Sequence, residues 1–316
     1  MPAPFLSVVM PSFKGAQWIA GALESVRSEA ETGIEIIVVD GDDDGATEQV
    51  VDRFRDQLQI RYFHRPDLTS WQAKTNFAVA EAAADYIAML HVDDLWLPGR
   101  AAAVRSWIAG NPAAVCHLSP SRLIDLAGRK IGTWRCPFEP SSQPLHRDDL
   151  IERLLVQNFI SCPAPVISRA AWRAVGGMDE TLWYTADWDF YLKLAAAGPV
   201  VYHSEALTAF RIHGSSLTVS GSRNATDFEQ QMQIVLDRHR SLLSPAAADR
   251  TLRLARKSIA INTDLAIAAA GSRTALLSAF RHLLTLWPRQ LLNYWQWSRF
   301  GERVIPRFRL RLAGRM

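Results

Sequence analysis

The stretch Tyr86-Ile87-Ala88-Met89-Leu90-His91-Val92-Asp93-Asp94 decides the fold of this chain of 316 residues. Its first five residues form the apolar run of a buried strand, and a pair of carboxylates follows almost at once. Two earlier runs have the same form: residues 6–10 lead into Pro11-Ser12, and residues 35–39 lead into Asp40. Each run therefore predicts a buried strand that ends on polar groups.

Segments with helical spacing of apolar residues separate these strands. They are residues 18–31, 47–58 and 72–84, and residues 60–63 add a further short strand. Strands that alternate with helices in this way predict the α/β class, with a mostly parallel, Rossmann-like sheet flanked by helices on both faces. Ligands of such sheets bind at the carboxyl ends of the strands, where the polar residues named above would meet.

The rest of the chain departs from this repeat. Glycine and proline are frequent in residues 117–147, which predicts strands and loops there. Residues 166–168 resume as a strand, and from Phe228 onward the pattern is almost entirely helical. We therefore predict two domains, a sheet-based domain over residues 1–225 and a helical C-terminal extension over residues 226–316.

Composition excludes several classes of protein. Hydrophobic residues make up 48% and charged residues 21% of the chain, as in an ordinary folded protein. The formal net charge of +3 is too small to indicate a nucleic-acid partner. No GxGxxG, GxxxxGK[ST] or GxSxG motif is present, which argues against dinucleotide enzymes, P-loop NTPases and α/β-hydrolases.

Cysteine usage and hydropathy indicate the compartment. Cys116, Cys136 and Cys162 lie far apart and form no CxxC pair, so neither a zinc site nor a disulfide framework is indicated. Reduced thiols in the cytosol are the simplest interpretation. Pro11 and Lys14 interrupt the apolar N-terminal residues, so no signal peptide is expected. No apolar run reaches about 18 residues, and we expect a cytoplasmic protein, soluble or peripheral at the inner face of the membrane.

The pair Asp93-Asp94 is the first candidate for chemistry. Paired carboxylates at a strand end form a hard-oxygen site that suits Mg²⁺ or Mn²⁺, ions that commonly bind diphosphate oxygens. A turn or helix cap is the structural alternative, and for an isolated Asp-Asp pair it is the commoner one. At the end of the fourth strand of this fold, metal binding becomes the better interpretation.

Three other segments carry polar groups that could bind or react. Asp187 and Asp189 precede an apolar helix, so one could act as a general base for a hydroxyl while the other caps the helix. Arg211 and His213 follow a strand-like run and could bind phosphate or a metal, although a histidine beside a glycine turn is more often structural. Asp40 opens an acidic turn and could accept a hydrogen bond from a nucleobase or ribose.

In combination, these segments resemble the family 2 glycosyltransferases, which have the A-type glycosyltransferase fold. The resemblance covers roughly residues 5–220. Its pieces, in chain order, are Ser7-Val8-Val9-Met10-Pro11-Ser12-Phe13, Ile36-Ile37-Val38-Val39-Asp40-Gly41, Asp85-Tyr86-Ile87-Ala88-Met89-Leu90-His91-Val92-Asp93-Asp94, Gly176-Gly177-Met178-Asp179-Glu180, Ala186-Asp187-Trp188-Asp189-Phe190 and Arg211-Ile212-His213.

The resemblance implies an inverting hexosyl transfer from a nucleotide-diphosphate sugar, usually a UDP-sugar, to an acceptor hydroxyl of a cell-surface polysaccharide or glycolipid. Asp187 would deprotonate that hydroxyl. Asp93 would bind Mn²⁺ or Mg²⁺ on the diphosphate, with His91 and His213 as further ligands. The residues implied to bind the donor are Pro11, Ser12, Asp40, Asn76, Asp94 and Arg211.

The sequence departs from the family pattern at the metal motif. His91 stands where the family commonly has Asp or Asn, and a neutral imidazole can ligate Mn²⁺ but brings no negative charge. Asp42-Asp43 replace the usual small residues of the second turn, and Ala186 replaces a frequent Glu. A nucleotide-sugar-binding protein without turnover is therefore an alternative, against which the retained Asp187 argues. Transfer to a polyprenyl phosphate is another, although the spanning helices often attached to such enzymes are missing.

The C-terminal extension combines leucine, phenylalanine and tryptophan with many arginines. Residues 273–316 contain a single acidic residue, Glu302. A basic helix with an apolar side can lie on an anionic membrane surface. Packing on the sheet-based domain or in a homodimer is an equally good interpretation of the same pattern.

Overall fold

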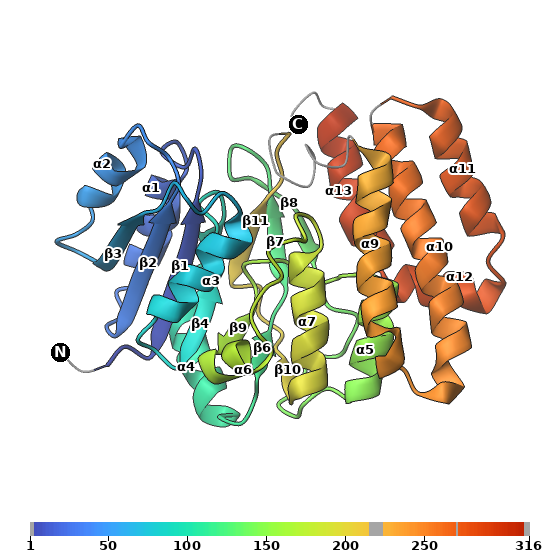
Figure 1. The fold of residues 1–316 in the computed structure, drawn as a ribbon, viewed down its shortest axis with the longest axis horizontal. Coiled ribbons are helices and arrows are strands. Elements are labelled where there is room, and N and C mark those ends of the chain that lie inside the picture. Colours follow the sequence, from blue (N-terminus) through green and yellow to red (C-terminus); the bar gives the residue numbers. More distant parts are fainter. Residues whose placement is uncertain (1–2, 215–223, 270, 313–316) are drawn as a thin grey trace.

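The computed structural model describes residues 3–214, 224–269 and 271–312 (Figure 1). Its central sheet has seven strands in the order β10-β6-β9-β4-β1-β2-β3. Neighbours among β1 to β4 are parallel, and β9 is antiparallel to both β4 and β6. The strands are β1 (Leu6–Ser12), β2 (Ile34–Asp40), β3 (Gln59–His64), β4 (Tyr86–Met89), β6 (Cys116–Leu118), β9 (Val166–Ser168) and β10 (Val200–Tyr202).

Helices cover both faces of this sheet. As a result, β1 and β2 bury every side chain along their length. Val8 and Met10 of β1 pack with helices on one face, whereas Val9 packs with helices on the other. The first set is α1 (Ile19–Arg27), α2 (Ala46–Asp52) and α4 (Arg100–Gly110). The second includes α3 (Trp71–Glu81), α5 (Arg147–Val156) and α7 (Ala186–Ala197). A short helix, α6 (Arg169–Ala174), follows β9.

A second sheet places residues distant in sequence beside the end of β4. It has four strands in the order β5-β11-β7-β8, and β11 pairs antiparallel with β5. Because β5 follows directly after Asp93-Asp94, this pairing brings the end of β11 to these carboxylates. The strands are β5 (Leu95–Trp96), β7 (Ser121–Ile124), β8 (Lys130–Trp134) and β11 (Thr208–Arg211).

The C-terminal helices lie on the far side of the molecule from β3 (Figure 1). They are α9 (Ala225–His239), α10 (Pro245–Ala269), α11 (Arg273–Leu284), α12 (Pro288–Trp297) and α13 (Phe300–Leu312), with a 3₁₀ turn at Arg240–Leu242. Phe228 of α9 and Ile259 of α10 belong to the same buried cluster as the central sheet. On α13, Pro306 packs so closely on β8 that a Cβ at Gly132 would lie 3.1 Å from its Cγ. The division of the chain at residue 225 stays a prediction.

The predicted α/β fold with a helical C-terminal region is confirmed, and two local predictions need correction. Helix α4 was not predicted, because alanine-rich residues 100–110 show little contrast between an apolar and a polar side. The helix predicted over residues 47–58 ends at Asp52, and turns complete the segment. In the described parts of the chain, no helix has the length and apolar character needed to cross a bilayer.

Candidate active site

Polar groups meet at the carboxyl ends of β1 and β2, as the sequence predicts. The Asp40 carboxylate is fully buried, and the Tyr62 hydroxyl donates to its Oδ2 at 2.8 Å. Lys74 of α3 reaches across and donates from Nζ to the Ser12 carbonyl oxygen at 2.7 Å. Burial lowers the pKa of Lys74 even though Asp40 lies close by. The neighbouring Pro11 and Ser12 side chains are buried in the strand end.

Glycine is required beside this group of residues. A Cβ at Gly41 would lie 2.4 Å from Lys74 Nζ, so a larger residue would displace the ammonium group. The chain therefore leaves β2 through a narrow turn in which Lys74 partly offsets the charges of Asp40 and Asp42.

The end of β4 and the end of β11 form a second polar group. The His213 Nε2 and Asp93 Oδ2 atoms are 2.8 Å apart. The backbone N–H of Arg211 donates to Asp94 Oδ1 at 2.9 Å, and its Nε donates to the Asp93 carbonyl oxygen at 2.8 Å. The guanidinium also donates to the carbonyl oxygens of Asp125 and Leu126. Four of the predicted site residues thus lie together.

The two adjacent carboxylates differ in environment. Asp94 is 2% exposed, and burial together with the charge of Asp93 raises its pKa well above the usual value. Burial also disfavours the charged form of Asp93, but the hydrogen bond with His213 holds its pKa below the usual value. The Asp93 side chain keeps 25% of its surface exposed. Asp93 is therefore the ionised carboxylate that a ligand can approach.

His91 has different neighbours. Its ring packs edge-on against Trp71 with centroids 5.3 Å apart, and its Nε2 lies 3.5 Å from Cys162 Sγ. Burial lowers the pKa of His91, so the imidazole is neutral. Across the described ranges, no three His, Cys, Asp or Glu side chains converge as a metal-holding group. The structure pairs Asp93 with His213, and ligation by His91 stays a prediction.

Asp187 stands in the first turn of α7, partly exposed. Asn158 Nδ2 donates to its Oδ2 at 3.1 Å, and the Trp188 backbone N–H donates to its Oδ1 at 2.7 Å. Burial raises the pKa of Asp187 to about 6, and these hydrogen bonds oppose the rise. A carboxylate with a pKa near 6 is ionised at neutral pH and still takes up a proton readily.

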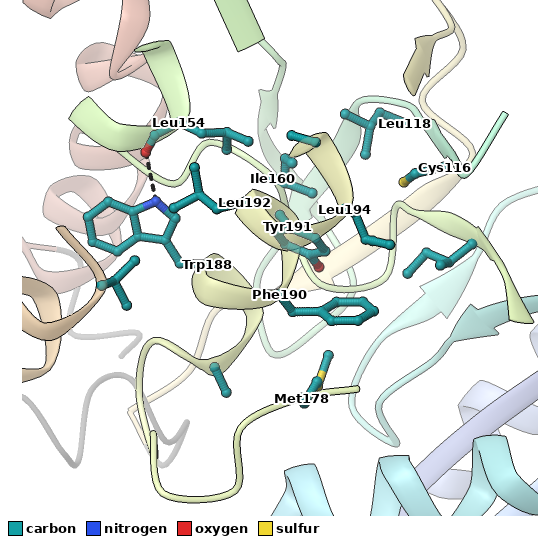
Figure 2. Close-up of a cluster of buried hydrophobic side chains, with 14 of the residues drawn as sticks. Cys116, Leu118, Leu154, Ile160, Met178, Trp188, Phe190, Tyr191, Leu192 and Leu194 are labelled. Carbon is teal, nitrogen blue, oxygen red and sulfur yellow. Dashed lines mark hydrogen bonds between the residues drawn. The ribbon is translucent and has the colours of Figure 1, made fainter. Parts of the chain in front are cut away.

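The core beneath α7 fixes the position of Asp187. Trp188 Nε1 donates to the Leu154 carbonyl oxygen of α5 at 2.7 Å, and Phe190 and Leu192 fill the interior around it (Figure 2). The start of α7 is therefore held by an apolar layer.

Asp189 has a structural role, which separates it from Asp187. It is fully buried, and its oxygens contact Arg238 at 2.8 Å, His239 at 2.8 Å and Lys193 at 3.0 Å. Burial alone would raise its pKa, but these three cationic or hydrogen-bonding partners hold the pKa well below its usual range. Asp189 thus joins α7 to α9, and Asp187 remains the candidate for reaction.

Asn76 lies on α3 and is engaged within the protein. Its Nδ2 donates to the Met178 carbonyl oxygen at 2.9 Å and to Glu180 Oε1 at 3.0 Å, while its Oδ1 accepts from the Met178 N–H at 3.0 Å. These bonds tie α3 to the turn before α7, in which Gly177 has a φ of 69°. Donor binding by Asn76 stays a prediction.

Sequence reasoning missed Lys74, Tyr62 and Asn158 as partners of the site carboxylates. Lys74 and Tyr62 lie in a predicted helix and a predicted strand, where nothing in their spacing singles them out. Asn158 follows α5 and meets Asp187 only through the packing of α5 against α7. Their positions depend on the fold rather than on local sequence.

Comparison with known proteins relates the part of the chain that carries most of these residues to a protein family. The model of glycosyl transferase family 2 matches residues 7–162. An uncharacterised glycosyltransferase of Rickettsia felis is 24% identical over 236 residues, which make up 73% of this chain and 37% of that relative. The alignment thus spans little more than a third of the relative's length.

Solved structures share the fold at low sequence identity. Residues 1–349 of S. aureus TarS in complex with UDP-GlcNAc match with a TM-score of 0.64 at 16% identity, covering 92% of this chain and 79% of that one. The mannosyltransferase PcManGT of Pyrobaculum calidifontis, in complex with GDP-Man and Mn²⁺, matches with a TM-score of 0.58 at 18% identity, covering 99% and 88%. Residues 7–162 match glycosyl transferase family 2, and the chain has the A-type glycosyltransferase fold shared by these solved structures.

Proposed function

We propose that the protein transfers a sugar, with inversion, from a nucleotide-diphosphate donor to an acceptor hydroxyl in the synthesis of a cell-surface polysaccharide or glycolipid. The observation that carries this proposal is Asp187, a partly exposed carboxylate with a pKa of about 6 that is held by Asn158 and its own helix. A UDP-sugar is the first candidate donor, because TarS of the same fold binds UDP-GlcNAc.

The donor's nucleoside would lie at the ends of β1 and β2. Asp40 is held there by Tyr62, and Lys74 lies beside Ser12. A buried carboxylate can accept from a nucleobase N–H or a ribose hydroxyl. Pro11 and Ser12 would form the adjoining wall. Recognition of the nucleoside therefore rests on side chains that the sheet already holds in place.

The residues at the end of β4 fit a divalent cation. Asp93 offers an ionised, partly exposed carboxylate and His213 an imidazole nitrogen beside it. An oxygen and a nitrogen ligand suit Mn²⁺, with diphosphate oxygens and water as its other ligands. PcManGT, which has the same fold, binds Mn²⁺ with its donor. When bound, the ion would offset the negative charge on the departing nucleoside diphosphate.

Asp187 would act on the acceptor. Its carboxylate takes the proton of the acceptor hydroxyl as that oxygen bonds to the anomeric carbon of the sugar. The bond from this carbon to the diphosphate breaks with its electrons on the leaving oxygen, and attack from the opposite side inverts the configuration. The hydrogen bonds from Asn158 and the Trp188 N–H aim the carboxylate and limit its rotation.

The rate of sugar transfer is expected to rise with pH through about 6. Asp187 must be deprotonated to accept the proton, and burial raises its pKa to about 6. Below that pH the rate should fall about tenfold per pH unit, as a single essential base requires. Initial rates from pH 4.5 to 8 at saturating donor check this. A flat profile across pH 5 to 7 would contradict the assignment.

Donor recognition is tested by calorimetric titration of the protein with UDP-, GDP- and dTDP-sugars, with and without Mn²⁺. We expect one nucleotide to bind at one site per chain, and to bind more tightly with Mn²⁺. Binding without turnover for any acceptor would favour a nucleotide-sugar-binding protein, whereas no binding of any donor would rule out both functions.

We further propose that the helical extension from residue 226 lies on the cytoplasmic face of a membrane with anionic lipids. Helices α11 to α13 and the turns joining them carry most of the exposed large hydrophobic side chains. Elsewhere in the described residues, only Phe13, Leu126 and Ile234 are of this kind. The three helices and the turns joining them expose Leu276, Leu277, Phe280, Leu284, Trp287, Leu291, Leu292, Trp295, Ile305 and Phe308, and also Arg273, Arg281, Arg289, Arg309 and Arg311.

The double variant Leu277→Ser with Leu284→Ser is expected to bind anionic vesicles at least about tenfold more weakly than the wild type, because both side chains are exposed leucines on α11. Co-sedimentation with vesicles of phosphatidylglycerol and phosphatidylcholine measures this, with Leu126→Ser as the matched control elsewhere on the surface. Absence of wild-type binding would contradict the proposal, and a dimer that the double variant dissociates would identify the surface as a homodimer interface.

A further inference from the structure

Two arginines of α13 lie half-buried, and no carboxylate of the described residues forms an ion pair with either. Arg303 and Arg307 are one helical turn apart, and Arg307 Nη1 donates to the Arg303 carbonyl oxygen at 2.6 Å. The Arg307 guanidinium also lies 5.6 Å from the centroid of the Trp134 ring. Within the described ranges, the acid on this helix, Glu302, pairs with Arg135 and more distantly with Arg299. The two charges are therefore left uncompensated.

Placing two like charges together in a partly buried position is costly. Burial lowers the pKa of Arg303, and burial with the charge of Arg303 lowers the pKa of Arg307 to about 10. Such a pair is normally neutralised by acidic groups. Because the described part of the chain provides no acidic group here, an anionic ligand is the group that would complete the site.

A chain of hydrogen bonds connects this pair to the proposed base. Arg303 Nη2 donates to Asn262 Oδ1 at 2.7 Å, and Asn262 Nδ2 donates to Gln157 Oε1 at 2.7 Å. The next residue, Asn158, donates to Asp187. The arginines therefore stand on the side of Asp187 that the C-terminal helices cover.

Tyr184, three residues before Asp187, gives a second link. Burial raises the pKa of the Tyr184 hydroxyl; the charges of Arg303 and Arg307 oppose this rise, and the charge of Asp187 adds to it. The proposed donor residues Asp93 and His213 lie at the junction of β4 and β11. Leu310 of α13 packs with Ile212, between Arg211 and His213, so competition with UDP is the measurement that separates an acceptor phosphate from the donor diphosphate.

We propose that Arg303 and Arg307 bind a phosphate group of the acceptor, so that the enzyme glycosylates a phosphate-bearing saccharide, polyol or lipid. The guanidinium fork matches phosphate oxygens in two hydrogen bonds at once. This inference rests on the proposed function, because it takes Asp187 as the group that receives the acceptor's proton. It adds to that function the chemical class of the acceptor.

The test is calorimetric binding of glycerol 1-phosphate, with glycerol and glycerate as comparison probes, to protein with and without saturating UDP. We expect glycerol 1-phosphate to bind one site per chain in both conditions and glycerol not to bind. The variant Arg307→Gln should weaken that binding at least about tenfold, since a charged hydrogen-bonding partner is lost. Arg309→Gln, an exposed neighbour on the same helix, is the matched control and should change nothing.

Three outcomes would overturn the proposal. The wild type could fail to bind glycerol 1-phosphate, or Arg303→Gln and Arg307→Gln could both bind it as tightly as the wild type does. The third is loss of glycerol 1-phosphate binding when UDP is present. Arg307→Lys keeps the charge without the fork, and an intermediate affinity would support the proposal if the glutamine variants fold poorly. Glycerate binding that depends on both arginines would support an anionic acceptor site whose ligand is a carboxylate. Failure of the donor function would show separately, as absence of nucleotide binding.

Discussion

Asp187→Asn is expected to lower the rate of sugar transfer by about 10²- to 10⁴-fold, the usual contribution of a general base. Asparagine keeps the size of the side chain and can still accept from Asn158 or from the Trp188 N–H. It cannot take a proton from an acceptor hydroxyl. Donor affinity should stay unchanged, because Asp187 is proposed to contact the acceptor hydroxyl rather than the nucleoside or the metal ion. Initial rates and calorimetry of one preparation measure both quantities.

The stability of the same variant separates lost chemistry from lost structure. The folded pKa of Asp187, about 6, lies above its ordinary value of 3.8. The carboxyl's contribution to stability is therefore present below pH 3.8 and is lost as pH rises to 6. At pH 8, removal of this charge should not lower the melting temperature. Asp189→Asn is the contrasting control, since it weakens contacts to Arg238 and His239 and should lower it.

The second large effect is expected at the proposed metal residues. Asp93→Ala should reduce transfer by about 10²- to 10³-fold and remove the stimulation by Mn²⁺, because it takes away the ionised, partly exposed carboxylate proposed to bind the ion. His213→Ala should have a smaller effect of the same kind, since it removes one nitrogen ligand and leaves the Asp93 carboxylate in place. Rates measured against Mn²⁺ concentration check both.

Asp85→Asn is the control for Asp93→Ala, because Asp85 immediately precedes the same strand and its side chain is 92% exposed. It should leave the rate and the Mn²⁺ response unchanged. A wild-type enzyme that is equally active after treatment with a chelator would contradict the metal proposal. An Asp93→Ala enzyme that keeps the wild-type Mn²⁺ response would contradict the choice of ligand.

Much of the fold could be predicted because its strands are strong local signals. Residues 34–40 and 86–89 are apolar runs whose residues pack on both faces of the sheet. The order of β6, β9 and β10 could not be predicted, because three-residue strands carry little pattern and pair through distant contacts. Helix α4 was missed for a related reason: its alanines mark no buried side.

The residues of the candidate site also divide into those that could be predicted from the sequence and those that could not. Asp40 and Asp93 follow predicted strands, so their meeting at one sheet edge follows from parallel topology. The roles of Asp187 and Asp189 were open in sequence, because both carboxylates lie in one helical turn and only the packing of α9 distinguishes them. Arg303 gave no site signal, since its partner Asn262 lies 41 residues away in another helix.

Single-turnover transfer from the bound nucleotide sugar, measured for the wild type and for Asp187→Asn with Mn²⁺ present, tests the central claim most directly. The proposed mechanism predicts that both proteins bind the donor and that only the wild type transfers or hydrolyses it at an appreciable rate. Equal turnover by the two proteins would contradict Asp187 as the base. Absence of both donor binding and turnover in the wild type would contradict the proposal that the protein is a glycosyltransferase.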